Sequence, residues 1–308
     1  MSKITIELPD TSLVCGGIRD SLILAERFDP KMMVRFQTMK SGYPQIPLQW
    51  TVGLPDRTFP ETDICITYSD NPYAEQLKSL QSVKKLYCLM LSWGMNLKNE
   101  RRNVHIKGIN VLCSSKKIEK AILAEGVNVK RIGIGLDMSK FYNTKSVRKN
   151  YIAILYHSMP SKRYAEAVQI ADNLYGKGLI EGVITFGQKD NYSLAKKPKG
   201  LVRHYENATS EQIREIFNIC RCYLMPSSTE GINLTPIEST LCGCPAVISD
   251  GAINEVYFNG ENCFVGSLEQ NCVEILKGDY SERFENHMRE TIKDMTWENV
   301  INNLKTVL

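Results

Sequence analysis

Two glutamates, Glu230 and Glu238, lie with seven residues between them in the stretch SSTEGINLTPIESTLCGCPAVISD, residues 227–250. The preceding CYLMPSS has the apolar character of a buried strand, and a helical pattern follows Glu230. Glu230 and Gly231 therefore come just after the carboxyl end of a strand, where doubly wound sheets bind ligands. We take the two carboxylates as candidate ligand-binding groups.

The start of the helix between them predicts an anion site. Thr235 followed by Pro236 is typical of an N-cap and a first helical residue, because the fixed φ and missing N–H of proline suit that position. The exposed N–H groups are then those of Ile232, Asn233 and Leu234. A helix N-terminus offers donors and a partial positive charge, which suits phosphate.

Both glutamates also have ordinary interpretations. Thr235 and Glu238 have the spacing of a capping box, in which the glutamate accepts a hydrogen bond from the N–H of the N-cap residue. Glu230 could equally be a solvated glutamate of a surface loop. The residues alone leave these alternatives open.

A basic cluster follows the first strand of the second half. The stretch YHSMPSKRYAEA contains His157, Lys162 and Arg163, and cations at a strand end are suited to clamping a diphosphate. Because Lys and Arg at a helix start oppose the helix dipole, their placement indicates a bound anion rather than a simple basic helix start. Gly16 and Gly17, in CGGIRDS, permit either a close backbone approach to a ligand or a simple turn.

Several motifs are absent from the sequence. It contains no D-x-D to hold Mg²⁺ or Mn²⁺ against a diphosphate, no G-x-x-x-x-G-K-[ST] and no G-x-S-x-G. Two C-x-C pairs, Cys220/Cys222 and Cys242/Cys244, have apolar neighbours, so we interpret them as buried small side chains rather than zinc ligands. We therefore expect a phosphorylated ligand bound without a metal or a cofactor.

The composition is that of a globular protein with unevenly spread charge. The chain has 308 residues, 43% of them hydrophobic, which is enough for two domains with separate cores. Residues 1–150 carry 23 Lys and Arg against 14 Asp and Glu, a net +9, whereas residues 151–308 carry 15 against 20, a net −5. The basic half predicts an anionic partner such as a phospholipid surface, a lipid phosphate or a nucleic acid, unless its basic helix faces are simply solvated.

The sequence predicts a cytoplasmic protein. No apolar run is long enough to span a bilayer, and MSKITIELPD has the pattern of a strand rather than of a signal peptide. Ten cysteines fit a reducing compartment better than a disulfide framework. Peripheral contact of the basic half with the cytoplasmic membrane face is an open alternative.

Short apolar runs alternate with amphipathic segments through both halves, which predicts parallel sheets covered by helices on both faces. The expected strands of the first half are KITIEL, DICITYS, KKLYCLML, INVLCSS and KRIGIGL. The fold class is therefore α/β, with two Rossmann-like doubly wound domains facing across a cleft. We expect domains over residues 1–143 and 144–280, with C-terminal helices over 281–308.

Five stretches, in order, resemble one family. PSSTEGINLTPIESTLCGCPAVISD, with the INEVYFNGENCFVG that follows, resembles the E-x₇-E segment of retaining GT-B glycosyltransferases that use nucleotide-sugars. YHSMPSKRYAEA is similar to the family's G-R-x-x-x-x-K-G, and RIGIGLDMSKFY to its I-x-N-G-[IV]-D-x-x-x-F. CGGIRDS resembles its N-terminal G-G loop, and MTWENV its closing F-S-W-E helix, which in this fold crosses back to the first domain.

The resemblance implies a role for each matched residue. Glu230 would contact the donor sugar near the reacting carbon, and Glu238 the nucleotide ribose. Lys162 matches the diphosphate-binding lysine, so the implied catalytic residues are Glu230 and Lys162. The remaining implied donor-binding residues are Gly16, Gly17, His157, Arg163, Gly231, Ile232, Asn233 and Leu234.

The implied activity is that of a retaining, metal-independent hexosyltransferase using a UDP- or GDP-sugar. Lys162 and the helix N-terminus would stabilise the leaving diphosphate. Retention would follow from attack on the same face, with a covalent glycosyl-enzyme as the alternative. Three departures affect donor contacts: His157 replaces the usual arginine, Asn233 replaces the second glycine of E-G-F-G, and SWGMN follows the KKLYCLML strand where many members have a histidine.

The basic first half predicts a glycan, lipid-linked or other anionic acceptor. Modified DNA is the second choice of acceptor, because no aromatic-interleaved basic run marks a nucleic-acid groove. A catalytically weak nucleotide-sugar-binding or scaffold protein of the same fold is the alternative function. A phosphorylase or a sugar-nucleotide epimerase of this fold is a further alternative.

Overall fold

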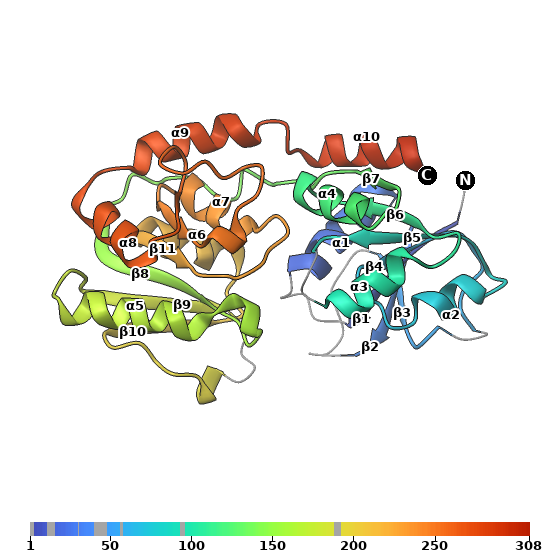
Figure 1. Cartoon of the computed structure of the whole chain (residues 1–308), viewed down its shortest axis with the longest axis horizontal. Coiled ribbons are helices and arrows are strands. Elements are labelled where there is room, and N and C mark those ends of the chain that lie inside the picture. Colours follow the sequence, from blue (N-terminus) through green and yellow to red (C-terminus); the bar gives the residue numbers. More distant parts are fainter. Residues whose placement is uncertain are drawn as a thin grey trace. The chain divides into compact units, whose positions relative to one another are not determined.

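The computed structural model of the chain describes residues 3–10, 16–29, 31–39, 48–55, 58–92, 96–187 and 192–308. The chain divides into two compact units (Figure 1). The first comprises Met1–Leu136 and Met295–Leu308, and the second comprises Asp137–Asp294. The division after Leu136 comes a few residues before the expected limit at 143, and the return at Met295 comes later than the expected 281.

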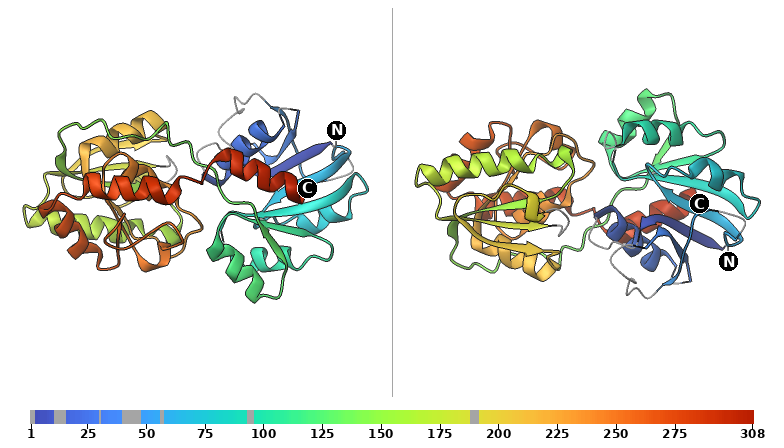
Figure 2. Two further views of the ribbon diagram at one scale, coloured as in Figure 1. Left: turned by 90° about the horizontal axis from the view of Figure 1, so that it is seen from above. Right: turned by 90° about the horizontal axis from the view of Figure 1, so that it is seen from below.

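The first unit holds a parallel sheet whose strand order, in the described residues, is β3-β2-β1-β4-β5-β6-β7. Its strands are β1 (Ile4–Asp10), β2 (Met33–Thr38), β3 (Gln49–Val52), β4 (Thr62–Tyr68), β5 (Val83–Met90), β6 (Asn110–Cys113) and β7 (Val129–Arg131). Its helices are α1 (Gly16–Phe28), α2 (Ala74–Ser79), α3 (Leu97–Val104), α4 (Lys116–Ala124) and α10 (Trp297–Val307). Helices α1 and α10 cover one face, and α2, α3 and α4 cover the other (Figure 2).

The second unit repeats this arrangement with the order β10-β9-β8-β11-β12-β13. Its strands are β8 (Lys149–Tyr156), β9 (Gly182–Gly187), β10 (Leu201–Glu206), β11 (Cys220–Met225), β12 (Ala246–Ile248) and β13 (Phe264–Val265). Its helices are α5 (Tyr164–Gly176), α6 (Ser210–Ile219), α7 (Leu234–Leu241), α8 (Leu268–Lys277) and α9 (Ser281–Ile292), with 3₁₀ turns η1 (Pro160–Lys162), η2 (Tyr192–Leu194) and η3 (Asp250–Ala252).

Both sheets reverse their strand order at one point. The chain proceeds outward from β1 to β3, then returns to place β4 on the other side of β1. In the second unit the same reversal places β11 beside β8. Such a switch point leaves space at the carboxyl ends of the two central strands, because the connections there run in opposite directions. The expected doubly wound α/β fold is confirmed for both units.

The helix α10 returns to the first unit, as expected for the closing helix. Trp297 and Leu304 join the core formed by β1, β2 and α1. Gly135 allows the close approach of Trp297, because a Cβ at Gly135 would come within 2.3 Å of the indole. Helix α9, expected to return with it, belongs to the second unit, where Asn143 donates to Glu285 at 3.0 Å.

Two strands of the first unit, β2 and β3, were not expected from the sequence. The stretch MVRFQT places Arg35 and Gln37 between apolar residues, so it lacks the apolar run of the other strands. Val34 and Phe36 face the core shared with α1 and α10, whereas Arg35 and Gln37 are buried on the opposite face. The sheet is polar there because of a group on the neighbouring strand.

That group is Glu7, whose carboxylate is fully buried on β1. Gln37 Nε2 and Thr67 Oγ1 donate to its two oxygens at 2.7 and 2.8 Å, and Asn71 Nδ2 donates as well. Tyr68 Oη donates to Gln37 Oε1 at 2.8 Å, which extends the network. Burial raises the pKa of Glu7 to about 7, although these hydrogen bonds and the nearby Arg35 favour the ionised form.

Among the described residues, none of the helices combines the length and the apolar character needed to cross a membrane.

We expect Glu7 to make the first unit less stable as the pH rises. The folded pKa, about 7, lies above the ordinary value of 4.5, so the folded state binds more protons between these limits. The free energy of unfolding should therefore fall by about 3 kcal/mol from pH 4.5 to pH 7, and Glu7→Gln should remove this slope.

Urea unfolding at pH 5, 6, 7 and 8 measures this effect. Tryptophan fluorescence reports the correct unit, because Trp50, Trp93 and Trp297 all belong to the first one. Glu75→Gln, at an exposed position of α2, is the control and should keep the wild-type slope. If the free energy of unfolding changed with pH in the same way in wild type and Glu7→Gln, Glu7 would not be the cause of the pH dependence.

Candidate active site

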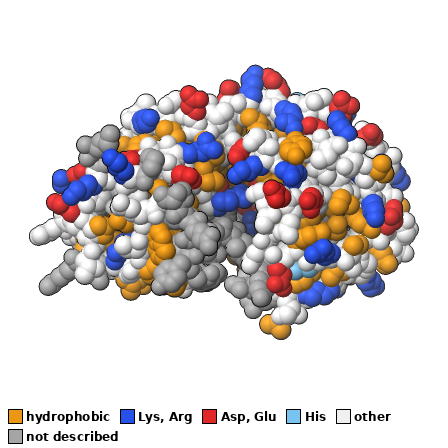
Figure 3. All heavy atoms as spheres, turned by 180° about the vertical axis from the view of Figure 1, so that it is seen from behind, with side chains coloured by type: hydrophobic (Ala, Val, Ile, Leu, Met, Phe, Trp, Pro, Cys, Tyr) orange, Lys and Arg blue, Asp and Glu red, His pale blue; other side chains and the backbone are white. Residues whose placement is uncertain are grey.

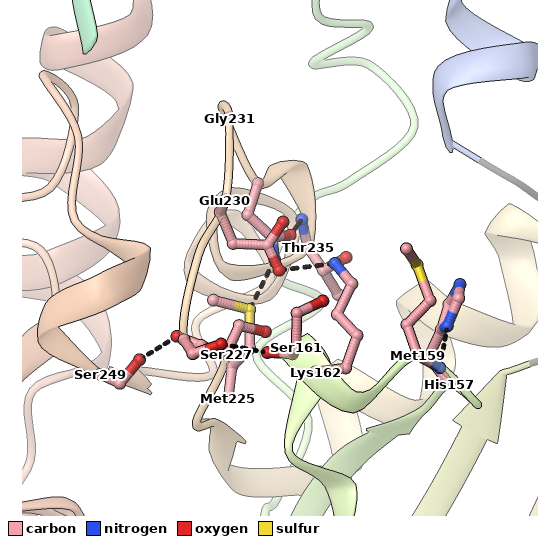
Figure 4. Close-up of polar contacts among 12 residues, drawn as sticks. His157, Met159, Ser161, Lys162, Met225, Ser227, Glu230, Gly231, Thr235 and Ser249 are labelled. Carbon is pink, nitrogen blue, oxygen red and sulfur yellow. Dashed lines mark hydrogen bonds and ion pairs between the residues drawn. The ribbon is translucent and has the colours of Figure 1, made fainter. Parts of the chain in front are cut away.

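The candidate site lies in the second unit at the carboxyl ends of β8 and β11, which is the switch point of its sheet. His157 follows β8, and the η1 turn then presents Lys162 (Figure 4). Glu230 follows β11 on the neighbouring loop. The N–H of Ser228 donates to the carbonyl of Ser161 at 2.8 Å, which joins the two loops through their backbones.

Lys162 and Glu230 form an ion pair across these loops. Lys162 Nζ lies 2.5 Å from Glu230 Oε1, and the two side chains are 14% and 7% exposed (Figure 4). A pair so nearly buried is strongly coupled, because removing either partner leaves an uncompensated charge in a poorly solvated place. The sequence-predicted residues Lys162 and Glu230 are therefore brought together by the fold.

His157 is neutral at physiological pH. Burial and, to a smaller extent, the nearby Lys162 ammonium lower the pKa of its imidazole to about 4, and Glu230 opposes this. Its Nδ1 accepts the N–H of Met159 at 3.0 Å. A neutral ring that accepts at Nδ1 carries its proton on Nε2, which leaves an N–H donor for a ligand.

Arg163 has a protein partner of its own. It adopts the left-handed conformation with φ 50° at the start of α5. Its guanidinium lies 2.5 Å from Glu166 Oε2, one turn into the helix, and also donates to the carbonyl of Pro226 at 3.4 Å. Because Glu166 offsets its charge, the position of Arg163 at a helix start is explained without a bound anion. The positive charge paired with Glu230 is that of Lys162.

The start of α7 differs from the expected one. The N-cap is Asn233 rather than Thr235, and Asn233 Oδ1 accepts the N–H of Thr235 at 3.1 Å. Asparagine is among the strongest N-cap residues, and Pro236 is still within the first turn, where its missing N–H costs nothing. The predicted capping box of Thr235 and Glu238 is therefore wrong. Glu238 lies buried on α7, one turn further into the helix.

The segment from Gly231 to Leu234 is fixed through its carbonyl groups. Asn254 Nδ2 donates to the carbonyl of Gly231 at 3.1 Å, and Tyr257 Oη donates to that of Asn233. Within the part of the chain that the structure describes, the backbone N–H groups of residues 231–234 have no hydrogen-bond acceptor in the protein. Backbone N–H groups without a protein acceptor at a helix start are the arrangement that suits an anion, and the anion site predicted here stays a prediction.

Two serines that sequence reasoning missed lie beside the ion pair. In the described residues, Ser161 Oγ and Ser227 Oγ are buried and have no hydrogen-bond partner (Figure 4). No spacing in the sequence marks them. Asn254 and Tyr257 were also missed as residues that hold the site, although both fall within the INEVYFNGENCFVG stretch that resembles the family.

Other predicted residues are only partly placed. Gly16 and Gly17 are the first two residues of α1 in the first unit, and the rest of their loop, residues 11–15, lies outside the described residues. Residues 93–95 of the SWGMN stretch also lie outside them. No group of three or more His, Cys, Asp or Glu side chains in the described ranges could hold a metal ion. The four C-x-C cysteines are fully buried.

Comparison with known proteins gives one family and a set of similar folds. Residues 179–293 match the family model of glycosyl transferases group 1. No curated protein matches the sequence. The structure resembles HepE from Anabaena, solved with UDP and glucose, over 100% of this chain and 99% of that chain, with 13% identity and a TM-score of 0.77.

Two further structures show the same likeness. Sucrose-phosphate synthase from Thermosynechococcus elongatus is 12% identical over 99% of this chain and 98% of that chain, with a TM-score of 0.76. A TarM variant from S. aureus, solved with fondaparinux, alpha-GlcNAc-glycerol and UDP, is 14% identical over 79% of this chain, with a TM-score of 0.62. This chain spans only 55% of that TarM chain.

The family match covers most of the second unit, and the likeness of fold covers both units. Residues 179–293 match glycosyl transferases group 1, and the whole chain has the GT-B fold of structures such as HepE and sucrose-phosphate synthase. The matched residues 179–293 include Glu230, the start of α7 and Glu238, whereas His157 and Lys162 precede them. The family match therefore covers one side of the switch point, and the other side is assigned by fold and geometry.

The N-cap of α7 can be tested directly. We expect Asn233→Ala to lower the free energy of unfolding of the second unit by about 1 kcal/mol, because a donor at the helix start loses its acceptor. Asn233→Gly, the residue at this place in the resembled family, should cost only about a few tenths of a kcal/mol. Unfolding of the second unit can be measured by far-UV circular dichroism and by hydrogen exchange of the amides of α7.

Asn233→Asp and Thr235→Ala are the matched controls. Asn233→Asp keeps a side-chain acceptor and should stay close to wild type in stability. A destabilisation by Thr235→Ala, with no effect of Asn233→Ala, would place the N-cap at Thr235 instead.

Proposed function

We propose that this glycosyltransferase transfers a hexose from a UDP-sugar to an anionic acceptor, with retention at the anomeric carbon and without a metal. The observation that carries the proposal is the Lys162–Glu230 ion pair, 2.5 Å long, at the switch point that also holds the start of α7. One charge suits a diphosphate and the other suits sugar hydroxyls. Support for UDP comes from the HepE and TarM structures, which were solved with it.

The proposed diphosphate site combines three kinds of donor. Lys162 supplies the full positive charge, residues 231–234 supply backbone N–H groups, and His157 Nε2 supplies a neutral donor. Cleavage of the anomeric bond leaves negative charge on the diphosphate, and donors already in place stabilise it as it develops. This set replaces the cation that a D-x-D motif would hold, so we propose that neither a metal nor a cofactor is required.

Donor binding is proposed to exchange the partners of the ion pair. A diphosphate carries more negative charge than one carboxylate, so Lys162 turns from Glu230 to the phosphates. Glu230 is then left with two unpaired oxygens, which hydroxyl groups of the sugar satisfy. The carboxylate also lies near the positive charge that builds on the anomeric carbon. Breaking and remaking this pair couples donor binding to the placement of Glu230.

Glu238 is proposed to bind the ribose. It is buried on α7, one turn beyond the free N–H groups, which is a suitable separation for a ribose attached to the bound diphosphate. Retention is proposed to follow from attack by the acceptor on the face that the diphosphate leaves, with the departing phosphate taking the acceptor proton. Gly16 and Gly17 and the net charge of +9 in residues 1–150 are proposed to serve a glycan or lipid-linked anionic acceptor.

We expect Lys162→Ala and Glu230→Gln to have opposite effects on UDP affinity. Lys162→Ala should weaken UDP binding by roughly tenfold or more and lower kcat/KM by about 10²- to 10³-fold, because the main cationic donor is lost. Glu230→Gln should bind UDP at least as tightly as wild type while losing turnover, because Lys162 no longer has a carboxylate competing for it. Isothermal titration and release of UDP from UDP-sugars measure both.

An exposed pair in the same unit provides the control. Lys177 Nζ lies 2.6 Å from Glu269 Oε1, so Lys177→Ala and Glu269→Gln remove an ion pair of similar length outside the site. Both should leave UDP affinity unchanged. Equal losses of UDP affinity in Lys162→Ala and Glu230→Gln would contradict the exchange of partners. Tight UDP binding with no transfer to any acceptor would favour the alternative function, a catalytically weak nucleotide-sugar-binding or scaffold protein of the same fold.

UDP should raise the melting temperature of wild type by mass action, and Glu238→Ala should lose most of this shift. At a concentration about 100 times Kd, the ligand adds about 2.7 kcal/mol to the stability of the unit that binds it. Glu215→Ala, at an exposed position of α6, is the control and should respond as wild type does. If GDP or ADP raised the melting temperature and UDP did not, the base of the proposed donor would have to be changed. If no nucleotide raised it, the donor site would be overturned.

A further inference from the structure

The edge of the second sheet at β10 exposes large apolar side chains. Strand β10 is the outermost strand on its side of the sheet. Leu194, in η2, is 84% exposed, and Val202, on β10, is 51% exposed. Tyr175, near the end of α5, is 39% exposed. We call residues 192–205 together with Tyr175 the β10 edge.

A buried aspartate holds the β10 edge together as one surface. Asp172 of α5 pairs with Lys196 at 3.0 Å and accepts the N–H of Lys199 at 2.7 Å, which fixes the turn between them on the helix. Gly200 has φ +69°, and a Cβ there would come within 2.4 Å of the Tyr175 ring. Tyr175 therefore lies against the chain just before β10. The apolar and basic side chains are therefore carried by neighbouring segments that contact α5.

The β10 edge is basic within an acidic half of the chain. Residues 192–205 contain Lys196, Lys197, Lys199 and Arg203 and no Asp or Glu, whereas residues 151–308 as a whole have a net charge of −5. Asp172 offsets Lys196 and Glu206 ends β10, so these residues keep a net positive charge. Lys and Arg side chains lie beside hydrophobic ones on the lower part of the second unit, at the right of Figure 3. Positive charge is therefore concentrated where the apolar side chains are exposed.

This combination suits a lipid surface better than a second protein strand. Leucine and valine side chains enter the boundary between headgroups and acyl chains, while lysine and arginine beside them bind lipid phosphates. Basic side chains on an edge strand oppose pairing with the edge of another copy. A purely electrostatic polyanion site would have no use for Leu194, which is almost fully exposed.

We propose that the β10 edge binds an anionic membrane surface, with Leu194 and Val202 entering the headgroup region and Lys199 and Arg203 contacting lipid phosphates. This contact is separate from the sugar-transfer site and does not depend on the donor proposed above. It would hold the enzyme at the surface where a lipid-linked acceptor is found. It also places the contact on the second unit, whereas the charge distribution had suggested the first.

Co-sedimentation with vesicles tests the proposal. Wild type should bind vesicles of phosphatidylcholine and phosphatidylglycerol and should not bind phosphatidylcholine alone. Lys199→Glu and Leu194→Glu should each weaken binding roughly tenfold or more, because one reverses a charge and the other places a charge among the lipids. Both variants should keep the wild-type melting temperature and the wild-type UDP affinity, since neither residue is in the donor site.

Matched variants separate the β10 edge from other surfaces. Val147→Glu changes an aliphatic side chain that is 94% exposed elsewhere in the second unit, and Lys293→Glu reverses an exposed lysine directly after α9. Both should bind anionic vesicles as wild type does. Lys120→Glu with Lys130→Glu, at exposed positions of the first unit, should also retain binding.

Three results would overturn the proposal. Equal binding of wild type to anionic and neutral vesicles would show that lipid charge plays no part in the contact. Loss of binding only in the variant of Lys120 and Lys130 would place the contact on the first unit. Binding of duplex DNA or heparin as tight as binding of vesicles, with the same sensitivity to Lys199→Glu and none to Leu194→Glu, would make the β10 edge a polyanion site. UDP binding is measured separately, so failure here leaves the donor assignment standing.

Discussion

The reversal of strand order between β8 and β11 is the constraint on which the site depends. Both strands are parallel and central, so the loops after them emerge at the same edge of the sheet and separate in opposite directions. The space between them brings Lys162, from one loop, to Glu230 of the other at 2.5 Å. The hydrogen bond between Ser228 and Ser161 fixes the separation of the two loops, and the ion pair closes within that frame.

The electrostatics of the site follow from this burial. Lys162 and Glu230 compensate each other in the absence of a ligand, so the site is close to neutral before it binds one. His157 adds a hydrogen-bond donor but no charge, because burial and Lys162 hold its pKa near 4. The remaining positive potential comes from the N–H groups at the start of α7. In the proposed function, a diphosphate would meet the charge of Lys162 and a set of backbone dipoles, which suits a group whose negative charge grows during the reaction.

The first unit uses burial for a different purpose. Its sheet has one apolar face, against which α1 and α10 pack, and one face with a polar layer centred on Glu7. Gln37, Thr67 and Asn71 satisfy the carboxylate, so the layer is held by directional bonds rather than by shape alone. The return of α10 is equally specific, because only glycine at position 135 leaves room for Trp297. These features hold the first unit together around a sheet in which strand β2 has apolar residues on one face and polar residues on the other.

The sequence by itself determined the fold class, most strands of the two sheets, the return of the last helix and the resemblance to glycosyltransferases that the family match over residues 179–293 supports. It could do so because alternation of apolar and amphipathic segments and a long motif are local properties. It missed β2, since the polarity of Arg35 and Gln37 has a cause only on the neighbouring strand that carries Glu7. It placed the N-cap of α7 at Thr235, because Pro236 is typical of a first helical residue. The sequence does not show that the helix begins earlier, with the side chain of Asn233 accepting the N–H of Thr235. The pairing of Lys162 with Glu230 and the neutral state of His157 were decided only by the tertiary structure. Each depends on distance and burial between segments far apart in the chain, and no spacing along the chain records those quantities.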